Sequence, residues 1–310
     1  MSRQSSIDLD SPDRPFDNII NFRDVGRSVN QFCGTQILQE GVLFRSARLD
    51  DASERDKRRL AEELHIATVV DLRSQTEHQM GTRKRRAELA SSDDPSDLDL
   101  TKHPVPLNAD EHLLHIPEAR RAMISLAGKG FERALLWKLD WVNYIKVIAL
   151  ATTGYRPDAV RLIGEQVMQP RGLTGLAQDT LDASTAEIRA VFERLARDEC
   201  YPALVHCTQG KDRTGLIVLL TLLLAGETVP TAAIVDDYVR SELELVPEFE
   251  ERMREIRALG LGEDYTRCPP GFVDAVTTYL YDRYGGVQAY LRGIGIDATM
   301  QERIRQKILA

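Results

Sequence analysis

The sequence has few cysteines, no excess of basic charge and no repeats, and each absence excludes a class of protein. Only four cysteines occur in 310 residues, at irregular spacing, so neither a disulfide framework nor paired zinc ligands is indicated. The formal net charge is -8, whereas binding along a nucleic-acid backbone requires a basic surface. We therefore expect no nucleic-acid partner and no fold that is held together by disulfides or metal.

A long clean apolar run is also missing. The most apolar stretch, residues 134–151, contains Lys138, Asp140 and Lys146 and falls short of the roughly 20 apolar residues that span a bilayer. The polar start, Met1 to Asp13, lacks the apolar core of a signal peptide. We expect no transmembrane segment, and a cytoplasmic location in which cysteines stay reduced.

What is present is enough apolar sequence for one large domain. At 43% hydrophobic, the chain can bury a substantial core. We expect a disordered tail over residues 1–15 and a single domain over 16–310, with a helical insertion at about 108–180.

Strand and helix signals alternate along the chain. Apolar runs predict strands around 42–45, 67–71, 105–107 and 203–205. Helices are predicted at 53–64, 184–196, 216–225, 231–244, 247–260, 272–284 and after Asp297, the first two opening on capping boxes, Ser53 with Asp56 and Ser184 with Glu187. This alternation predicts a layered α/β fold with a central, mostly parallel sheet flanked by helices.

The segment His206 to Gly215 carries the chemistry. It follows an apolar strand and precedes an apolar helix, and a short loop at a helix N-terminus binds oxyanions through converging N–H groups. The same field can lower the pKa of the Cys207 thiol from about 8.5 into the range of roughly 3.5–7.5. Arg213 can grip two phosphate oxygens with its planar fork, and Thr214 can donate its hydroxyl to the Cys207 sulfur. We predict nucleophilic attack by Cys207 on phosphorus and a thiophosphate intermediate.

Two other interpretations compete, and a third is excluded. Cys207 can be an inert buried residue at the end of a core strand. Enzymes of rhodanese-type sulfur transfer also use an anion-binding loop that begins with cysteine, but Arg213-Thr214-Gly215 at the start of a helix is the pattern of phosphatases. A nucleotide-binding P-loop is excluded, because that motif needs a glycine at Val205 and a serine or threonine at Asp212.

The loop resembles the signature of the cysteine-based phosphatase superfamily of protein tyrosine and dual-specificity phosphatases. Its interior, Gly210-Lys211-Asp212-Arg213, resembles the bacterial and fungal tyrosine-phosphatase-like branch, some members of which also hydrolyse phosphoinositides. Segments similar to that branch occur in the same order over about two thirds of the chain, but not clearly between about 108 and 179. They are Asn21–Gly26, Gly41–Leu49, Val70–Arg73 with Glu77, Asp237-Tyr238 with Ser241, and Tyr284–Gly286 with Tyr290-Leu291.

The resemblance implies a phosphatase fold, catalysis without a cofactor or metal, and a phosphorylated protein or phosphoinositide as substrate. The catalytic residues would be Cys207, Arg213 and Asp212. The residues that bind the phosphate would be Thr208, Gln209, Gly210, Lys211, Asp212, Arg213 and Thr214. The oligomeric state is not predicted.

The general acid is open among three carboxylates. Many relatives carry this aspartate on a separate upstream loop, where Asp179 and Asp182 stand in this chain. The branch that this chain resembles places an aspartate inside the loop, and Asp212 fills that position. Asp212 can alternatively only shape the loop, because perturbed carboxylates in clefts also occur for structural reasons.

Lys211, by analogy, points into the pocket mouth, where a second cation would favour phosphoinositides; the alternative is a solvated loop lysine. Arg23, Arg45, Arg48 and Arg73 are expected to be structural, paired with carboxylates such as Asp24, Asp71 or Glu77. The run Arg83 to Arg86 is expected to be a solvated helix face rather than a membrane anchor. His112 and His115 have helical metal spacing but no third ligand, so we expect surface histidines.

The insertion at 108–180 is expected to bury its apolar run against the domain or a partner and to cover the active site as a lid, rather than to span a membrane or anchor in one. The function that fits best is a cysteine-dependent phosphatase acting on phosphotyrosine, and also on phosphoserine or phosphothreonine if it has dual specificity. The alternatives are a phosphoinositide phosphatase and a non-catalytic protein that binds phosphorylated ligands. The last is disfavoured because Cys207, Arg213 and an acid are all present.

Overall fold

The computed structural model describes residues 15–92 and 112–310. A five-stranded sheet in the order β1-β2-β5-β3-β4 forms the centre. All neighbouring strands are parallel except β1, which runs antiparallel to β2. The strands are β1 (Arg23–Asp24), β2 (Leu43–Ser46), β3 (Thr68–Asp71), β4 (Arg120–Met123) and β5 (Ala203–His206). The predicted α/β fold with a mostly parallel sheet is therefore confirmed.

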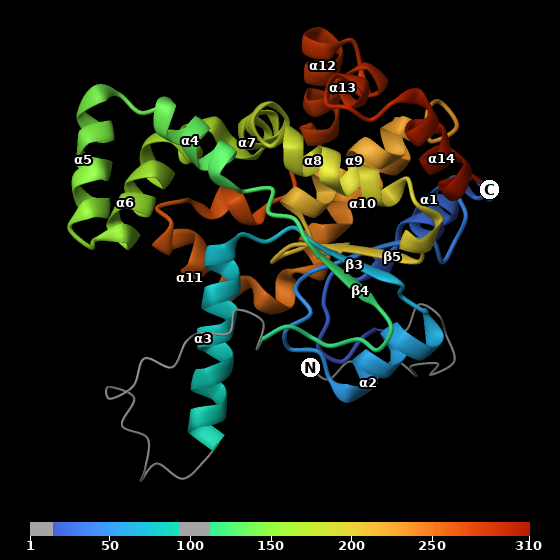
Figure 1. The fold of residues 1–310 in the computed structure, drawn as a ribbon, viewed down its shortest axis with the longest axis horizontal. Helices are drawn as coiled ribbons and strands as arrows, with labels where there is room; N and C mark the ends of the chain where they lie inside the picture. Colours follow the sequence, from blue (N-terminus) through green and yellow to red (C-terminus); the bar gives the residue numbers. More distant parts are fainter. Residues whose placement is uncertain (1–14, 93–111) are drawn as a thin grey trace.

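Helices cover both faces of the sheet (Figure 1). They include α1 (Val25–Cys33), α2 (Glu54–Arg58) with a π-helical turn (Arg59–Glu63), α3 (Gln75–Ser92), α8 (Thr185–Leu195), α9 (Asp212–Ala225), α10 (Thr231–Glu244), α11 (Phe249–Ala258), α12 (Phe272–Tyr284), α13 (Val287–Gly293) and α14 (Ala298–Ile308). Between β4 and α8 lie α4 (Lys129–Trp137), α5 (Trp141–Thr152), α6 (Arg156–Ile163), a second π-helical turn (Gly164–Met168) and α7 (Gln169–Ala183). Of the described residues, none belong to a helix that is both long and apolar enough to cross a bilayer.

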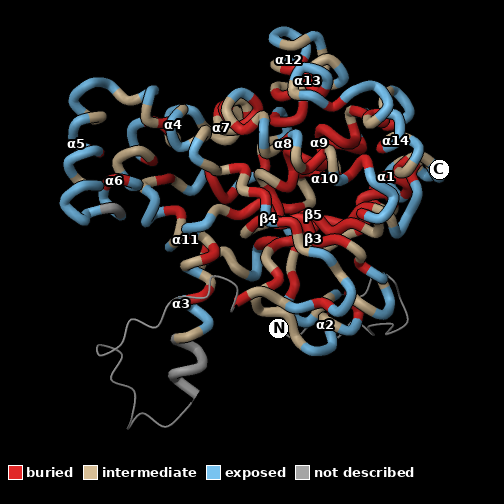
Figure 2. The backbone as a smooth tube through the Cα atoms, viewed as in Figure 1, coloured by how far each residue is buried: buried red, intermediate tan, exposed pale blue. Residues whose placement is uncertain are grey.

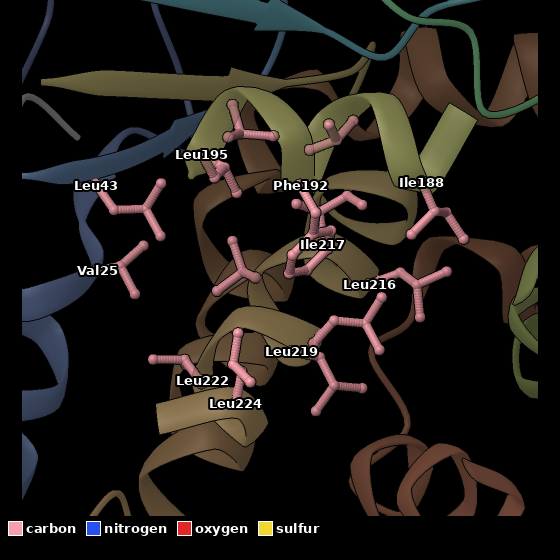
Figure 3. Packing of buried hydrophobic residues seen from close by; sticks show 14 of the residues in the cluster. Val25, Leu43, Ile188, Phe192, Leu195, Leu216, Ile217, Leu219, Leu222 and Leu224 are labelled. Carbon is pink, nitrogen blue, oxygen red and sulfur yellow. The ribbon is translucent and has the colours of Figure 1, made fainter. Parts of the chain in front are cut away.

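The main core lies between the sheet and α9. Leu43, Val70 and Val205 face this core, and the intervening Phe44, Val69 and Leu204 face a second core on the other side. This alternation follows from the two-residue period of a strand, and it makes the central strands apolar on both faces. Helix α9 is apolar on nearly every side, and it packs against α8 in Figure 3 through Leu216, Ile217 and Phe192. The strand before Cys207 and the helix after it are thus both held rigidly.

Most predicted elements are present, and the exceptions have clear causes. The capping box at Ser53 and Asp56 forms as predicted. The one at Ser184 does not, because the Ser184 hydroxyl donates instead to the Leu126 carbonyl oxygen at 2.7 Å, and α8 is stabilised by its buried apolar stripe. The predicted strand at 105–107 and nearly all of the predicted tail lie outside the described residues.

The predicted insertion is wrong at its start. Strand β4, within the 108–180 range, pairs with β3 and belongs to the central sheet, so the helical part of that range is the segment from α4 to α7, which we refer to as the insertion. The β4 sequence, Arg-Arg-Ala-Met, lies at the sheet edge and buries only Ala122, so it lacks the apolar run that marks the inner strands.

A buried ionic centre joins the sheet to α10. The Asp237 carboxylate of α10 accepts from Arg45 Nη1 and from Arg23 Nε, the latter at 2.8 Å. Burial alone would raise the pKa of Asp237, but the Arg23 and Arg45 guanidinium groups outweigh it and hold this pKa below its ordinary value. Arg23 and Arg45 are therefore structural as predicted, although their carboxylate partner is Asp237 rather than the residues expected.

We expect Asp237→Ala to lower the free energy of unfolding by about 3–5 kcal/mol, because it leaves two buried guanidinium groups without their partner. Urea denaturation near neutral pH measures this. Asp236→Ala is the matched control. Its carboxylate pairs with Arg240 one turn along the same helix, and the loss in free energy of unfolding should be about 0.5 kcal/mol. Since the Asp237 pKa is depressed in the folded state, its contribution is present above the unfolded pKa of about 3.9 and is lost as the pH falls below it. Equal losses for the two variants would contradict this role.

Candidate active site

Cys207 stands at the carboxyl end of the central strand β5, immediately before a tight loop. The loop passes through Gly210, which has φ of 66°, and then enters α9 at Asp212. A Cβ atom on Gly210 would lie 2.1 Å from the Ser46 carbonyl oxygen, so glycine is required both by the left-handed backbone and by the close approach to β2. The strand, loop and helix thus have the arrangement that the sequence predicted.

Four carbonyl groups of the loop turn outward and accept hydrogen bonds from groups around it. The pairs are Thr208 with Arg48 N–H at 3.0 Å, Gln209 with Asn21 Nδ2 at 2.9 Å, Gly210 with Arg45 Nη2 at 2.7 Å, and Lys211 with Gly215 N–H at 2.9 Å. These bonds occupy the loop carbonyls and leave the loop N–H groups as its available donors. The N–H of Gly210 donates to Cys207 Sγ at 3.2 Å. Within the described residues, the N–H groups of Thr208, Gln209 and Lys211 have no acceptor.

Arg213 is held over this loop by Glu77 of α3. Its Nη1 and Nη2 donate to the two Glu77 carboxylate oxygens at 2.7 and 2.6 Å, and the Thr208 hydroxyl donates to the same carboxylate. Burial opposes both charges, but their pairing outweighs it, so the pKa of Glu77 lies below its ordinary value and that of Arg213 above. The bidentate bond uses the end of the guanidinium and leaves Nε–H and the outer Nη2–H as a second fork, unpartnered among the described residues.

Three further residues of the loop region are placed as follows. Thr214 is fully buried, and its hydroxyl has no partner in the described part of the chain. Asp212 begins α9, 41% of its side chain is exposed, and its carboxylate lies 3.1 Å from Lys211 Nζ. Lys211 itself is fully buried, and its ammonium donates to the carbonyl oxygens of Tyr265 and Arg267 at 2.9 and 2.7 Å.

The placement of Lys211 corrects both predictions made for it. It is not a solvated loop lysine, and its ammonium faces the backbone of the 3₁₀ turn Glu263–Thr266 rather than an open pocket mouth. Analogy located the residue in the loop, but the direction of its side chain depends on a turn more than fifty residues later, which the local sequence cannot reveal.

The upstream carboxylates lie in helix α7 rather than in a loop. Asp179 is buried and pairs with Arg171 and Lys138 at 2.6 and 3.3 Å. Asp182 accepts from the hydroxyl groups of Tyr279 and Tyr284 on α12. Neither carboxylate has a bond to the Cys207 loop, whereas Asp212 is part of its exit into α9.

Behind Cys207 lies a buried charge network, of which sequence reasoning anticipated only that Arg73 would pair with a carboxylate such as Asp71. His206 directs Nε2 to the Asp71 carboxylate at 3.3 Å and Nδ1 to the Cys207 carbonyl oxygen at 3.2 Å. Asp71 also accepts from Arg73 Nη2 at 2.8 Å and lies 3.3 Å from Arg121 Nη1. Burial raises the pKa of Asp71, but His206 and Arg73 outweigh it and hold that pKa well below its ordinary range. The sequence signal that could have revealed this network is a polar side chain at the end of each of two apolar strands, Asp71 of β3 and His206 of β5.

The remaining candidate residues are mostly structural. Arg73 pairs with Asp71 as predicted, and Arg48 pairs with Glu248 and Glu251 near α11. Lys84 of the basic run lies 3.4 Å from both Asp51 and Glu251, in agreement with the predicted polar face of a helix.

The prediction of surface histidines is wrong for His112. It is buried beside Gly81, and its ring contacts His78 and Thr82 at 3.0 Å each. Burial lowers the pKa of His78 and of His112. His115 is exposed as expected. In residues 15–92 and 112–310, no cluster of three or more histidine, cysteine or carboxylate side chains could hold a metal ion.

Comparison with known proteins agrees with this geometry. The chain is 34% identical over 138 residues to a tyrosine-protein phosphatase of Nostoc commune, an alignment that covers 41% of this chain and 46% of that protein. It therefore spans about half the length of this relative. It is 27% identical over 312 aligned positions to the triple specificity protein phosphatase PtpB of Mycobacterium tuberculosis, covering 93% of this chain and 96% of that protein. The family model described as the tyrosine phosphatase family matches residues 14–310. The chain belongs to the tyrosine phosphatase family.

Proposed function

We propose that this member of the tyrosine phosphatase family hydrolyses phosphomonoesters on proteins, phosphotyrosine above all, through a thiophosphate on Cys207. The observation that carries the proposal is a loop whose carbonyls are already hydrogen-bonded and whose Gly210 N–H donates to Cys207 Sγ, with Arg213 held beside it by Glu77. The N–H groups of Thr208, Gln209 and Lys211 have no acceptor within the described residues, so the loop has donors available for the three non-bridging oxygens of a phosphate.

In the first step, the Cys207 thiolate attacks phosphorus and the bond from phosphorus to the leaving oxygen breaks. Asp212 gives its proton to that oxygen. In the second step, water attacks phosphorus, the bond between sulfur and phosphorus breaks, and Asp212 takes the proton from the water. The Nε and Nη2 fork of Arg213 holds two phosphate oxygens throughout, and Thr214 donates its hydroxyl to the departing thiolate.

The rival functions are less well supported by these contacts. The phosphoinositide alternative depended on a second cation at the pocket mouth, and Lys211 instead binds carbonyl groups of the turn at Glu263–Thr266. A non-catalytic binding protein has no need of a nucleophile placed within reach of a loop N–H, as Cys207 is. A phosphate-release panel of phosphotyrosine peptides, phosphoserine or phosphothreonine peptides and phosphoinositides tests the substrate class.

We expect Cys207→Ser to reduce turnover by at least about 10³-fold while vanadate or phosphate still binds, because the N–H groups and Arg213 remain in place. Arg213→Lys should reduce kcat/KM by roughly 10²–10³-fold, since a point charge cannot replace the planar fork. Steady-state kinetics and calorimetry of oxyanion binding measure both effects. Turnover near the wild-type rate in the serine variant would overturn the covalent mechanism.

Glu77→Gln should lower kcat/KM by roughly 10²-fold, because an amide cannot accept both Arg213 bonds and the Thr208 bond, and the fork loses its orientation. Glu193→Gln is the matched control: its carboxylate pairs with Arg189 at 2.7 Å on the exposed side of α8. The proposal requires this control to keep wild-type kinetics. Glu77→Gln with unchanged activity would show that Arg213 does not depend on Glu77.

Asp212→Asn should lower kcat by roughly 10²–10⁴-fold for alkyl phosphates and far less for activated aryl phosphates, because a poor leaving group needs the proton most. The dependence of kcat on leaving-group pKa separates this role from a structural one through Lys211. Asp182→Asn, which disturbs only contacts to α12 and its Arg283, serves as the comparison. If Asp182→Asn alone shows the leaving-group effect, the acid is Asp182.

A further inference from the structure

Helix α5 directs its apolar face outward. Trp141, Val142, Ile145 and Ile148 are spaced to lie along one side of the helix, and they are 74, 59, 49 and 42% exposed. On the opposite side, Val147 is buried against the rest of the insertion. We call these four exposed side chains the outward face of α5. Of the two expected ways to bury the apolar run, against the domain or against a partner, this helix does not use the first.

Both tryptophans of the chain lie at this end of the molecule. Trp137, at the end of α4, is 78% exposed and is separated from Trp141 by only three residues, or at most about 14 Å of chain. A tryptophan ring is rarely left so exposed, because contact of its large apolar area with water is unfavourable. Single exposed apolar residues need no explanation, but a row of four on one helix beside a second tryptophan marks an interaction surface.

The charges nearest the outward face are Lys146, on α5, and Asp140, whose carboxylate is used in capping the N-terminus of the helix. From Trp141 to Pro157 the sequence has no aspartate or glutamate, although 48 acidic residues occur in the chain, and its only charged residues are Lys146 and Arg156. Lys146 is exposed and borders the outward face on α5. In a chain of net charge -8, Lys146 is therefore the point beside this face at which an anionic surface would be attracted.

The insertion also projects from the body. Figure 1 shows α5 and α6 at one edge of the molecule, away from the sheet, and Figure 2 shows that α5 is exposed along almost its whole length. A projecting helix can lie on a flat surface without hindrance from the rest of the chain. At 12 residues, α5 is about 18 Å long, which suits a helix lying in the plane of a bilayer surface rather than crossing it.

We propose that the outward face of α5, with Trp137, docks on the surface of an anionic lipid bilayer. The apolar row enters the boundary between headgroups and acyl chains, the tryptophan rings lie at the level of the headgroups, and Lys146 contacts anionic headgroups. This inference depends on the surface of the insertion and not on the chemistry of Cys207, so it stands or falls separately from the proposed function.

The test uses the full chain, carrying Cys207→Ser so that turnover plays no part. Vesicles of phosphatidylcholine and phosphatidylserine in a 3:1 ratio should co-float with the protein, and its tryptophan fluorescence should shift to the blue. Because Trp137 and Trp141 are the only tryptophans, this shift reports the proposed surface alone. Pure phosphatidylcholine vesicles should bind more weakly, and high salt should reduce binding to the anionic ones.

The triple variant Trp141→Ser, Ile145→Ser, Ile148→Ser should lower vesicle partitioning by at least about tenfold. The matched control is Leu243→Ser with Tyr281→Ser, which removes two exposed apolar side chains from α10 and α12 and should bind like the parent. Circular dichroism checks that each variant stays folded.

Absence of vesicle binding by the parent, or equal binding by the triple variant, would overturn the proposal. Two further results would also overturn it by identifying another occupant. A loss of self-association in the triple variant would identify a second copy of the chain. The triple variant can also be made in the active chain, with Cys207 intact. If it alters the kinetics with a small soluble phosphomonoester while the parent does not bind vesicles, the face closes over the catalytic loop, as expected of a lid. Vesicle binding by a chain that lacks phosphatase activity would leave the inference intact and contradict only the proposed function.

Discussion

The buried guanidinium of Arg45 connects the framework of the protein to its reactive loop. One nitrogen pairs with Asp237 of α10, and the other donates to the Gly210 carbonyl oxygen at 2.7 Å. Because Arg45 is fully buried, its charge is tolerable only with both partners present, so the sheet, α10 and the loop are each required for the others. The turn at Gly210 can approach β2 only without a side chain, and Arg45 then holds the carbonyl oxygen of that turn.

Two further charged pairs hold the residues on either side of the loop. His206, just before Cys207, is held by Asp71, and Arg213, just after the loop, is held by Glu77. The first pair joins β5 to the end of β3, and the second joins α9 to α3. Satisfied buried networks of this kind restrict the positions that each side chain can adopt. The reactive segment is therefore ordered by its surroundings and not by its own short sequence.

The sequence was most informative where local chemistry decides the structure. The loop from His206 to Gly215 and helices such as 231–244 and 272–284 could be located because turn glycines, helix caps and apolar periodicity act over a few residues. The partners Asp237 for Arg45 and Tyr265 for Lys211 could not be found, because they are set by packing between distant segments. Strand β4 was missed because an edge strand with one buried residue carries almost no pattern. The exposure of α5 was missed because its apolar composition alone argued for burial.

The outward fixing of the loop carbonyls limits what the loop itself can distinguish. Four separate groups hold those carbonyls before any ligand arrives, so little free energy is spent on ordering the donors at binding. Backbone N–H donors fixed in this way can respond to the size and charge of an oxyanion but not to a group attached beyond it. Discrimination among esters of the same anion must then reside in the walls around the loop, and those walls can diverge between relatives while the loop stays unchanged.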